Sequence, residues 1–392
     1  MLFLPRNFLL GFQAQEQPLK RNKTMANKVY NFSAGPSVLP EQALKEASAA
    51  CIDFENSGIS ILSMSHRSKP IESMFAQTED YLRELMGIPE NYDIVFLGGG
   101  CSLLFCMLPM NFLDQNATAD YALTGVWANK AYKEAKQFGN ALAACDTKSE
   151  TYSRIDKNLK LSDNASYLHV TANNTIYGTE WHNFPKPKSG FLMADVSSDF
   201  LARKINVSDF GVVYGGAQKN ISCAGVTVTI IRKDLLGKVN RTIPTMLNFQ
   251  THIDNKNMFN TPPVFAVYVM NRTLKWLKEF GGVEAIEKVN RGKAALLYSA
   301  LDNSKVFVGT AAKEDRSIMN VPFVFNKDVV AADKADDLAK EFLEFAKARG
   351  LQQLKGHRSV GGFRASIYNA MPVEGVQVLV DCLGDFEKKV LG

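Results

Sequence analysis

Apolar and polar positions along the chain follow two alternating patterns. Residues 37–58 and 71–87 have the apolar spacing of helices, with Pro40 suited to a first helical turn and Gly58 to a helix end. Other segments are short and apolar almost without interruption. Such runs indicate strands buried on both faces, so the pattern predicts an α/β fold with a mainly parallel sheet. The expected strands lie within residues 92–100, 119–125, 165–175, 190–199, 210–218 and 225–232.

The same patterns divide the chain into two predicted domains. Strands and helices alternate through residues 41–285, as in a large α/β domain. Its last helical segment, 262–280, is followed by another at 281–304, and we expect a break at the two glycines that begin the second segment. The rest of the chain reads as strand, helix, strand and helix, which predicts a smaller α/β domain over residues 286–392.

The first 26 residues are apolar and basic and are left out of the fold prediction. Pro5 and Arg6 interrupt the apolar stretch, which argues against a secretory peptide. Residues 1–26 are therefore either a transit-like leader or an upstream start placed before a true Met25, and we expect them to be disordered. We expect residues 27–40 to pack near the active site.

Composition narrows the class of protein. The chain has 392 residues, 46% of them hydrophobic and 22% charged, as in globular proteins large enough for two domains. The net charge of +5 comes from basic residues spread along the chain, and no apolar run is long enough to cross a bilayer. We therefore expect neither a nucleic-acid nor a membrane partner. The six cysteines form no CxxC pair and the five histidines no metal-ligand spacing. This predicts reduced thiols, a cytoplasmic location and no bound metal.

Lys219 is placed unusually, after the apolar run "FGVVYGG" and the two residues that follow it. One interpretation is a loop lysine whose ammonium group reaches solvent. The other is a lysine that forms a Schiff base, because partial burial lowers the pKa of an amine and makes it nucleophilic. The small neighbours Gly215, Gly216 and Ala217 would leave room for a flat cofactor.

Asp195 ends another apolar run, "GFLMAD". It is either a turn or capping residue or the partner of a pyridinium nitrogen, which a carboxylate keeps protonated. A lysine and an aspartate in these two roles are a recognised arrangement of pyridoxal phosphate enzymes. Ser197 and Ser198 follow closely enough to line the same pocket.

Two further segments bear on such a site. The three glycines of "FLGGGCS", residues 96–102, let the backbone approach a ligand, and a helix that follows them would direct its amides at a phosphate. Neither a Walker loop nor a G-x-G-x-x-G pattern is present there. Trp127, after the run "ADYALTG", is either a core aromatic residue or a plate stacked on a planar ring.

Basic residues form two pairs, His66–Arg67 and His357–Arg358, and Arg364 follows the second pair closely. Such pairs usually lie on a solvated surface. Both nevertheless adjoin apolar or glycine-rich sequence, and guanidinium groups bind carboxylate and phosphate bidentately. A substrate that carries both groups would suit them.

Nine segments taken together resemble the phosphoserine aminotransferase family, a group of class V, fold type I pyridoxal phosphate transaminases. The match runs from about residue 29 to residue 390 in the family's order. It implies a large domain with a mainly parallel seven-stranded sheet and a smaller C-terminal α/β domain. The segments are "NFSAGPSVLP", "SHRSKP", "FLGGG", "TGVWANKAYKEAK", "NNTIYG", "ADVSSDFLARKI", "GVVYGGAQKNI", "MFNTPP" and "GHRSVGGFRASIYNAM".

The resemblance implies roles for residues of this chain. Lys219 is similar to the lysine that binds pyridoxal 5′-phosphate covalently, and Asp195 to the partner of the ring nitrogen. Trp127 is similar to the residue that stacks on the ring, and Arg364 to the arginine that binds the substrate α-carboxylate. The further cofactor contacts implied are Cys101, Ser102, Thr175, Gln218, Asn260 and Thr261. The group implied for the substrate phosphate, or for the side-chain carboxylate of glutamate, is His66, Arg67, His357 and Arg358.

The implied activity is reversible transfer of the amino group from L-glutamate to 3-phosphohydroxypyruvate, which gives O-phospho-L-serine and 2-oxoglutarate in serine biosynthesis. Some bacterial relatives also accept 4-phosphohydroxy-L-threonine of pyridoxine biosynthesis. The resemblance implies a homodimer with one pyridoxal phosphate per subunit and active sites at the interface, since Asn260 and Thr261 are similar to residues that reach the neighbouring subunit's cofactor. Ser102 departs from the pattern, because some members have an arginine there that helps to bind the substrate phosphate.

Other functions stay open at this point. A serine–glyoxylate or alanine–glyoxylate transaminase, or a cysteine desulfurase, would share Lys219 and Asp195. A desulfurase would also need a nucleophilic cysteine, and Cys101 and Cys223 lie beside the cofactor segments. A non-catalytic relative would hold the cofactor without turning over substrate. A dinucleotide-binding oxidoreductase is disfavoured because its glycine fingerprint is missing.

Overall fold

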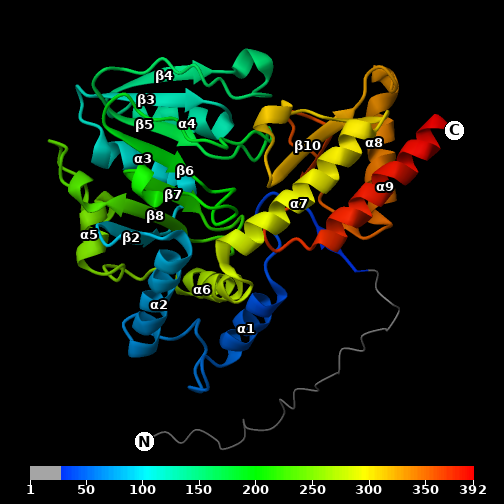
Figure 1. Ribbon diagram of the computed structural model, residues 1–392. Coiled ribbons are helices and arrows are strands. Elements are labelled where there is room, and N and C mark those ends of the chain that lie inside the picture. Colours follow the sequence, from blue (N-terminus) through cyan, green and yellow to red (C-terminus); the bar gives the residue numbers. More distant parts are fainter. Residues whose placement is uncertain (1–27) are drawn as a thin grey trace, which may run out of the picture.

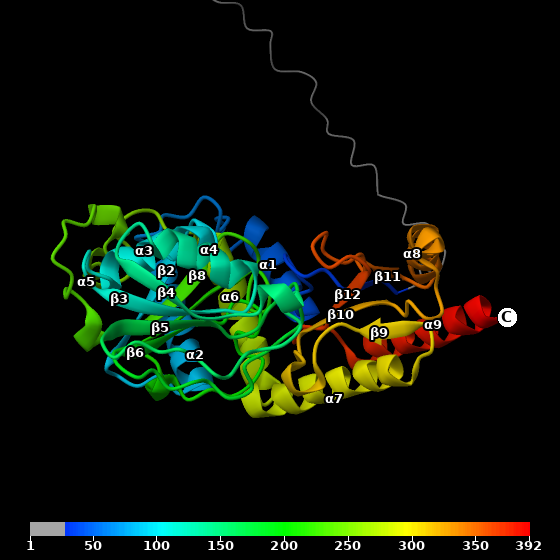
Figure 2. The ribbon, with the colours of Figure 1, turned by 90° about the horizontal axis from the view of Figure 1, so that it is seen from above.

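The computed structural model describes residues 28–392, so the segment 1–26, interpreted above as a leader or an upstream start, lies outside the described part. Two bodies of unequal size are joined by the long helix α7 (Gly282–Asn303) (Figure 1). The larger body contains a seven-stranded sheet, and the smaller one contains a three-stranded sheet and a two-stranded sheet. Seen from above, α7 passes from the larger body to the smaller (Figure 2).

The large sheet has the strand order β2-β8-β7-β6-β5-β3-β4. All pairs from β7 to β4 are parallel, whereas β8 runs antiparallel to both of its neighbours. The predicted α/β fold with a mainly parallel sheet is therefore confirmed. The strands are β2 (Tyr92–Leu97), β3 (Thr118–Leu123), β4 (Asn140–Asp146), β5 (Ala165–Thr171), β6 (Phe191–Asp195), β7 (Val212–Gly216) and β8 (Thr227–Arg232).

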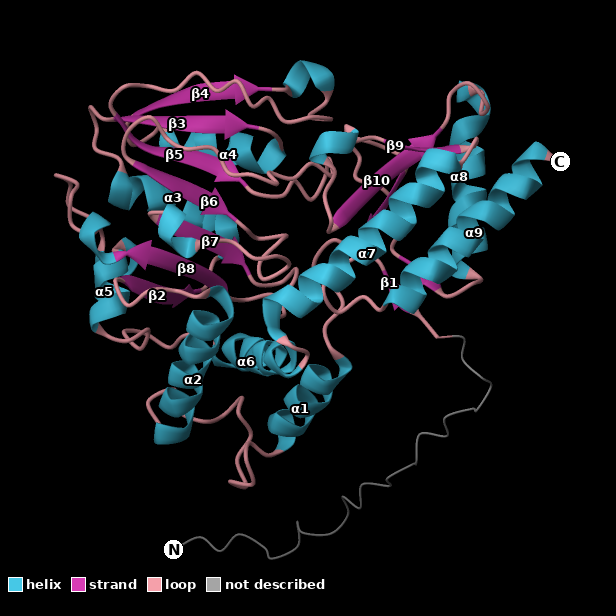
Figure 3. Cartoon of the chain, in the orientation of Figure 1, coloured by secondary structure: helices cyan, strands magenta, loops and turns pink. Residues whose placement is uncertain are grey.

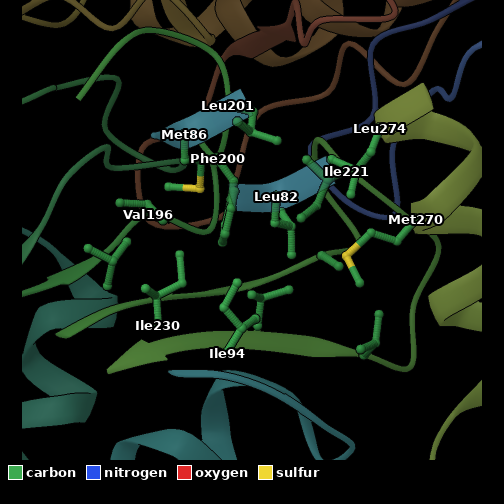
Figure 4. Packing of buried hydrophobic residues seen from close by; sticks show 14 of the residues in the cluster. Leu82, Met86, Ile94, Val196, Phe200, Leu201, Ile221, Ile230, Met270 and Leu274 are labelled. Atoms are coloured by element: carbon green, nitrogen blue, oxygen red, sulfur yellow. The ribbon is translucent and has the colours of Figure 1, made fainter. Parts of the chain in front are cut away.

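Helices cover both faces of this sheet, which explains the uninterrupted apolar runs. Every residue of β6 and β7 is buried, and alternate residues of each strand enter different apolar clusters. One face packs against α3 (Gly100–Phe112), α4 (Val126–Ala135) and α5 (Phe249–Asp254). The other packs against α1 (Glu41–Ile52), α2 (Lys69–Met86) and α6 (Val264–Glu279). Figure 4 shows this second cluster, with Leu82 of α2 and Met270 of α6 above Ile94 and Ile230 of the strands.

Helix ends test the predictions made from proline and glycine. The break between α6 and α7 is confirmed, with Gly281 and Gly282 at φ values of 110° and 77°. The predicted end of α1 at Gly58 is wrong, because the helix stops at Ile52. Glu55 and Asn56 then adopt positive φ, which non-glycine residues rarely do.

The smaller body is built on β10 (Asn320–Phe325), which pairs antiparallel with β9 (Phe307–Gly309) and β12 (Phe363–Ser366). Helices α8 (Ala332–Lys347) and α9 (Val373–Leu391) share its apolar core with the second half of α7. The strand β1 (Tyr30–Asn31) pairs with β11 (Leu351–Gln352), so the beginning of the described chain joins this body. Short 3₁₀ helices occupy Lys148–Glu150, Val207–Asp209, Lys233–Leu235, Thr245–Leu247 and Lys313–Asp315.

Helix α7 belongs to both cores. Val283 and Ile286 lie in the core of the larger body, whereas Leu297 and Leu301 lie in the core of the smaller one. The proposed domain boundary after residue 285 falls within this helix. Within residues 28–392, none of the helices combines the length and the apolar character needed to span a membrane.

Candidate active site

The carboxyl ends of β5, β6 and β7 lie next to one another. Thr171, Asp195 and Tyr214 are paired in register across these three strands. In Figure 3 the arrowheads of β3 to β6 point toward the smaller body. Ligands of open α/β sheets bind at this edge, so the residues just beyond the strand ends define the candidate site.

Lys219 follows β7 by three residues, and its side chain is half-buried. Its Nζ donates a 2.6 Å hydrogen bond to Thr175 Oγ1 and lies 5.7 Å from the centre of the Trp127 ring. Burial lowers the pKa of Lys219, and the positive charge of Arg364 lowers it further, although the charge of Asp195 acts in the opposite direction. These surroundings disfavour the interpretation as a solvent-exposed loop lysine and fit a nucleophilic amine.

The segment before α1, within the residues 27–40 that we expect near the active site, covers the Lys219 backbone. Ser37 N–H donates a 3.1 Å hydrogen bond to the Gln218 carbonyl, and the Ser37 hydroxyl donates to the Lys219 carbonyl. A Cβ atom on Gly35 would lie 3.2 Å from Lys219 Cγ, and its φ of 150° also favours glycine. The only sequence signal was the segment "NFSAGPSVLP", whose glycine and serine have no evident role in isolation.

Asp195 is buried at the end of β6. Its Oδ1 accepts hydrogen bonds from Ser197 N–H, at 2.9 Å, and from Ser197 Oγ, at 2.6 Å. Burial raises the pKa of Asp195, while the Ser197 hydrogen bonds and the Lys219 charge lower it. The bond from the Ser197 N–H, two residues along the chain, is the one that an aspartate makes in a turn. Within residues 28–392, no hydrogen bond engages Oδ2. The carboxylate therefore makes the turn and keeps one oxygen for a ligand.

The glycines after β2 form the start of α3. Gly99 and Gly100 have φ values of 87° and 66°, and no side chain of the described chain caps this helix. The amides of its first turn are therefore available to an anion, and the helix dipole adds to their attraction for phosphate. Cys101 and Ser102 are the next residues of that turn, and Ser102 is exposed.

Trp127 lies in the first turn of α4, just after β3. Its ring is half-buried and lies near two lysines, with Lys130 Nζ 4.5 Å from the ring centre. The indole Nε1 is buried without a hydrogen-bond partner among the described residues. A ring beside Lys219 that is only partly covered fits the stacking role better than the role of a core residue.

Arg364, on β12 of the smaller body, reaches the same site. Its guanidinium donates a 3.3 Å hydrogen bond to the Thr175 carbonyl. The pKa of His357 is lowered by burial and by the nearby charges of Arg364, Arg358 and Lys130. These positive groups therefore gather at the side of the site that faces the smaller body, where they would attract an anionic substrate.

Four predicted site residues are not brought to this group. His66 and Arg67 lie in the loop between α1 and α2, and Asn260 and Thr261 lie just before α6. No hydrogen bond or ion pair within residues 28–392 joins any of the four to Lys219 or its neighbours. Figure 1 shows α1, α2 and α6 beyond the β2–β8 edge of the sheet.

The cysteines beside the site are unsuited to nucleophilic attack. Burial raises the pKa of the Cys101 thiol to about 12 and also raises that of Cys223. Since the thiolate is the reactive form, this disfavours a desulfurase. Within residues 28–392, no group of three or more histidine, cysteine or acidic side chains could hold a metal ion.

A half-buried amine, a carboxylate with an unengaged oxygen and an uncapped helix start thus lie at this edge of the sheet, and known proteins similar to the chain identify its class. The family model "Aminotransferase class-V" matches residues 29–379. Phosphoserine aminotransferase of Bacteroides thetaiotaomicron is 49% identical to this chain over 364 residues, which are 92% of this chain and 99% of that protein. The chain belongs to the class-V aminotransferases and, among them, to the phosphoserine aminotransferase family.

Solved structures show the same relationship. The phosphoserine aminotransferase from Bacillus circulans subsp. alkalophilus superposes with a TM-score of 0.87 at 42% identity, covering 92% of this chain and 99% of that one. The pyridoxal phosphate-bound phosphoserine aminotransferase from Trichomonas vaginalis superposes with a TM-score of 0.86 at 38% identity, covering 91% of this chain and 100% of that one.

Proposed function

We propose that this protein is a pyridoxal phosphate-dependent phosphoserine aminotransferase, which transfers the amino group of L-glutamate to 3-phosphohydroxypyruvate and forms O-phospho-L-serine and 2-oxoglutarate. The observation that carries the proposal is that Lys219 and Arg364 both bond to Thr175 at one edge of the sheet, where Lys219 also lies beside Trp127 and in the field of the Asp195 charge. The relatives at nearly half sequence identity over almost the whole chain support the choice of substrate.

The residues fit the cofactor by their chemistry. Asp195 Oδ2 suits a protonated ring nitrogen, the start of α3 suits the phosphate, and Trp127 suits the ring face. Lys219 would hold the cofactor covalently. Bound pyridoxal phosphate supplies an electron sink for the negative charge that develops at the substrate Cα.

Lys219 would then act as the general acid and base. An amine that is free of the cofactor would take the proton from the substrate Cα as a base and would later donate that proton as an acid. Burial favours the neutral amine that this step needs. The Thr175 hydroxyl, at 2.6 Å, would hold the amine in place between the two halves of the reaction.

The cationic group would select the substrates. Arg364 suits the α-carboxylate because its planar fork binds carboxylates bidentately. His357 and Arg358 would receive the phosphate of one substrate and the side-chain carboxylate of the other. Ser102 supplies no charge at the place where some relatives carry an arginine, so these residues would bear more of the phosphate binding.

A second copy of the chain would complete the site. Four site residues lie in the loops next to α2 and α6, beyond the β2–β8 edge of the sheet: His66, Arg67, Asn260 and Thr261. Three of the four are exposed, and His66 Nε2 is buried without a hydrogen-bond partner among the described residues. We therefore propose a homodimer in which these residues serve the partner's site. We propose the cytoplasm as the compartment of this protein, because its reducing conditions suit the six free cysteines.

Subunit mixing tests this arrangement. Lys219→Ala and Arg67→Ala homodimers should each have little activity. Mixed after dissociation, they should recover roughly a quarter of wild-type activity, since half of the dimers then hold one intact site. No recovery, with mixed dimers demonstrated by mass, would place Arg67 in the site of its own chain or outside any site.

The half-reaction tests the function itself. The purified protein should show the visible absorption of bound pyridoxal phosphate. O-phosphoserine and glutamate, added separately, should each bleach that band, whereas alanine should not. If the absorption band does not change with O-phosphoserine but changes with another amino acid, the protein is still a pyridoxal phosphate-dependent aminotransferase, and the named substrate is refuted. The same assay with 4-phosphohydroxythreonine decides whether that substrate is also accepted.

A further inference from the structure

Ser197 joins Asp195 to two neighbouring elements. Its N–H and its hydroxyl both lie against Asp195 Oδ1, at 2.9 and 2.6 Å. The same hydroxyl lies 3.0 Å from the Gly216 N–H at the end of β7 and 3.2 Å from Cys101 Sγ in the first turn of α3. Ser197 and Asp195 are both buried. One serine thus links the ends of β6 and β7 with the start of α3.

The number of protons fixes the direction of these bonds. A serine hydroxyl has one proton and can accept two hydrogen bonds. The 2.6 Å contact with a carboxylate takes that proton, and the Gly216 amide can only donate. Cys101 must therefore donate its thiol proton to Ser197, and burial keeps that thiol protonated by raising its pKa to about 12. The result is a chain of donors from Cys101 through Ser197 to Asp195.

Both Ser197 donors act on the same oxygen of the carboxylate, Oδ1. Hydrogen bonds to the ionised form of an acid stabilise it, and the effect is large where water is excluded. Asp195 is in such a place, because burial alone raises its pKa. Since Oδ1 receives both Ser197 bonds, Oδ2 is the oxygen left for the cofactor.

We propose that Ser197, supported by Cys101, is a positioning residue that holds the Asp195 carboxylate ionised and turned with Oδ2 toward the ring nitrogen. The inference rests on the proposed function for its catalytic consequence, but the effect on Asp195 is present in the protein without cofactor. The titratable groups that share the field of Asp195 are Lys219, Cys101, Tyr214 and Asp199.

The apoprotein gives the first test. Aspartate labelled with ¹³C at the carboxyl carbon reports ionisation, and Asp195→Asn identifies the resonance. In Ser197→Ala the proton affinity of Asp195 should rise about tenfold or more, because both its hydroxyl donor and the link to Cys101 are lost. Ser198→Ala is the matched control, since Ser198 bonds to Asn173 and not to Asp195. An unchanged Asp195 titration in Ser197→Ala would overturn the proposal.

The holoenzyme gives the second test. With ¹⁵N at the ring nitrogen of pyridoxal phosphate, the wild type should show the protonated signal, and Ser197→Ala should move it toward the unprotonated position. We expect kcat to fall about tenfold with little change in KM. Ser197→Ala with a wild-type ¹⁵N signal and kcat would refute the positioning role. If the wild type does not catalyse transamination but the apoprotein titration shifts as expected in Ser197→Ala, the proposed function fails and the inference about Asp195 stands.

Cys101 variants keep the proposal testable if Ser197→Ala does not fold. Cys101→Ala removes only the outermost donor, so the proton affinity of Asp195 should rise by a smaller factor, about two- to threefold. Cys101→Ser restores a donor and should return the titration to the wild-type position. Equal titrations in wild type, Cys101→Ala and Cys101→Ser would remove Cys101 from the donor chain.

Discussion

Lys219 Nζ donates a 2.6 Å hydrogen bond to the hydroxyl of Thr175, and the two residues come from the ends of different strands. The carbonyl of the same threonine accepts a hydrogen bond from Arg364 of the smaller body. Thr175 is buried and so has little freedom to move. It therefore connects the proposed acid–base group with the proposed carboxylate-binding group, and fixes their separation.

Replacing Thr175 by valine keeps the shape of the side chain and removes the acceptor. We expect kcat to fall about 3- to 10-fold, the range for one hydrogen bond between uncharged groups, because the Lys219 amine loses its position when it is not bound to the cofactor. Thr175→Ser keeps the hydroxyl and should retain most of the activity. Steady-state kinetics with saturating substrates measures both variants, and a wild-type kcat in Thr175→Val would show that the bond has no catalytic part.

Replacing Asp195 by asparagine removes a charge from a buried position without changing the shape. We expect kcat to fall about 10²–10³-fold, as when a preorganised electrostatic partner is lost. The midpoint temperature of thermal unfolding of the apoprotein should be unchanged or higher in this variant, because burial of the charge is itself unfavourable.

Asp199→Asn is the matched control for that variant, since Asp199 is an equally buried acid four residues away. Its partner is Arg203, at 3.2 Å, which also bonds to Glu180. We expect Asp199→Asn to change the stability of the protein more than its kcat. A comparable loss of kcat in both variants would indicate a general effect of charge on the site and not a particular role for Asp195.

Arg364 and His357 should divide the work of substrate binding. Arg364→Ala should raise KM for glutamate and for 3-phosphohydroxypyruvate by about 10- to 100-fold each, because both substrates have an α-carboxylate. His357→Ala should raise mainly the KM of the phosphorylated substrate. Arg364→Lys keeps the charge but not the bidentate geometry, so it should recover only part of the loss. Equal effects of His357→Ala on both substrates would argue against this division.

His357 also predicts a difference in pH dependence. Its pKa lies below the usual value because of burial and the charges of Arg364, Arg358 and Lys130. The cationic form that attracts phosphate is therefore present at low pH and is lost as pH rises through this lowered pKa. We expect KM for the phosphorylated substrate to rise more than KM for glutamate over that range. In His357→Ala the difference between the two profiles should disappear.

The parts of the site that sequence could predict are those set by strand ends. Asp195 and Lys219 each follow an apolar run, and parallel strands bring their carboxyl ends to one edge. The contacts of Arg364 with Thr175, and of Ser37 with Lys219, join residues 189 and 182 positions apart. They depend on how the smaller body packs against the larger through α7, which no local pattern contains.

Local conformation explains why the end of helix α1 could not be predicted from the sequence. Helix α1 was expected to continue to Gly58 because glycine commonly ends helices. Instead Phe54 turns into the core, and Glu55 and Asn56 adopt positive φ values of 54° and 58°. Tertiary packing of one aromatic side chain thus overrides the helical pattern of its neighbours. The role of Ser197 could not be predicted either, because it depends on tertiary packing with Gly216 of β7 and Cys101 at the start of α3.

Lys293 predicts how stability changes with pH. It is fully buried in α7, and its Nζ donates to the carbonyls of Tyr368, at 2.7 Å, and Met371, at 3.0 Å. Burial lowers its pKa from 10.5 to about 7. Between these two values the unfolded chain binds a proton that the folded chain does not, so the free energy of unfolding rises with pH. Below the folded pKa the cost of the buried cation is fully present, and above the unfolded pKa it is gone.

Lys293→Met should therefore lose this part of the pH dependence. Relative to the variant, the wild type should become more stable as pH rises from about 7 to 10.5, and the difference should be constant outside that range. Chemical denaturation of both proteins across this range measures it. Lys288→Met, which removes an exposed lysine from the same helix, should leave the slope unchanged. A wild type and a Lys293→Met variant with parallel profiles would mean that Lys293 keeps its proton in the folded protein, in spite of its burial.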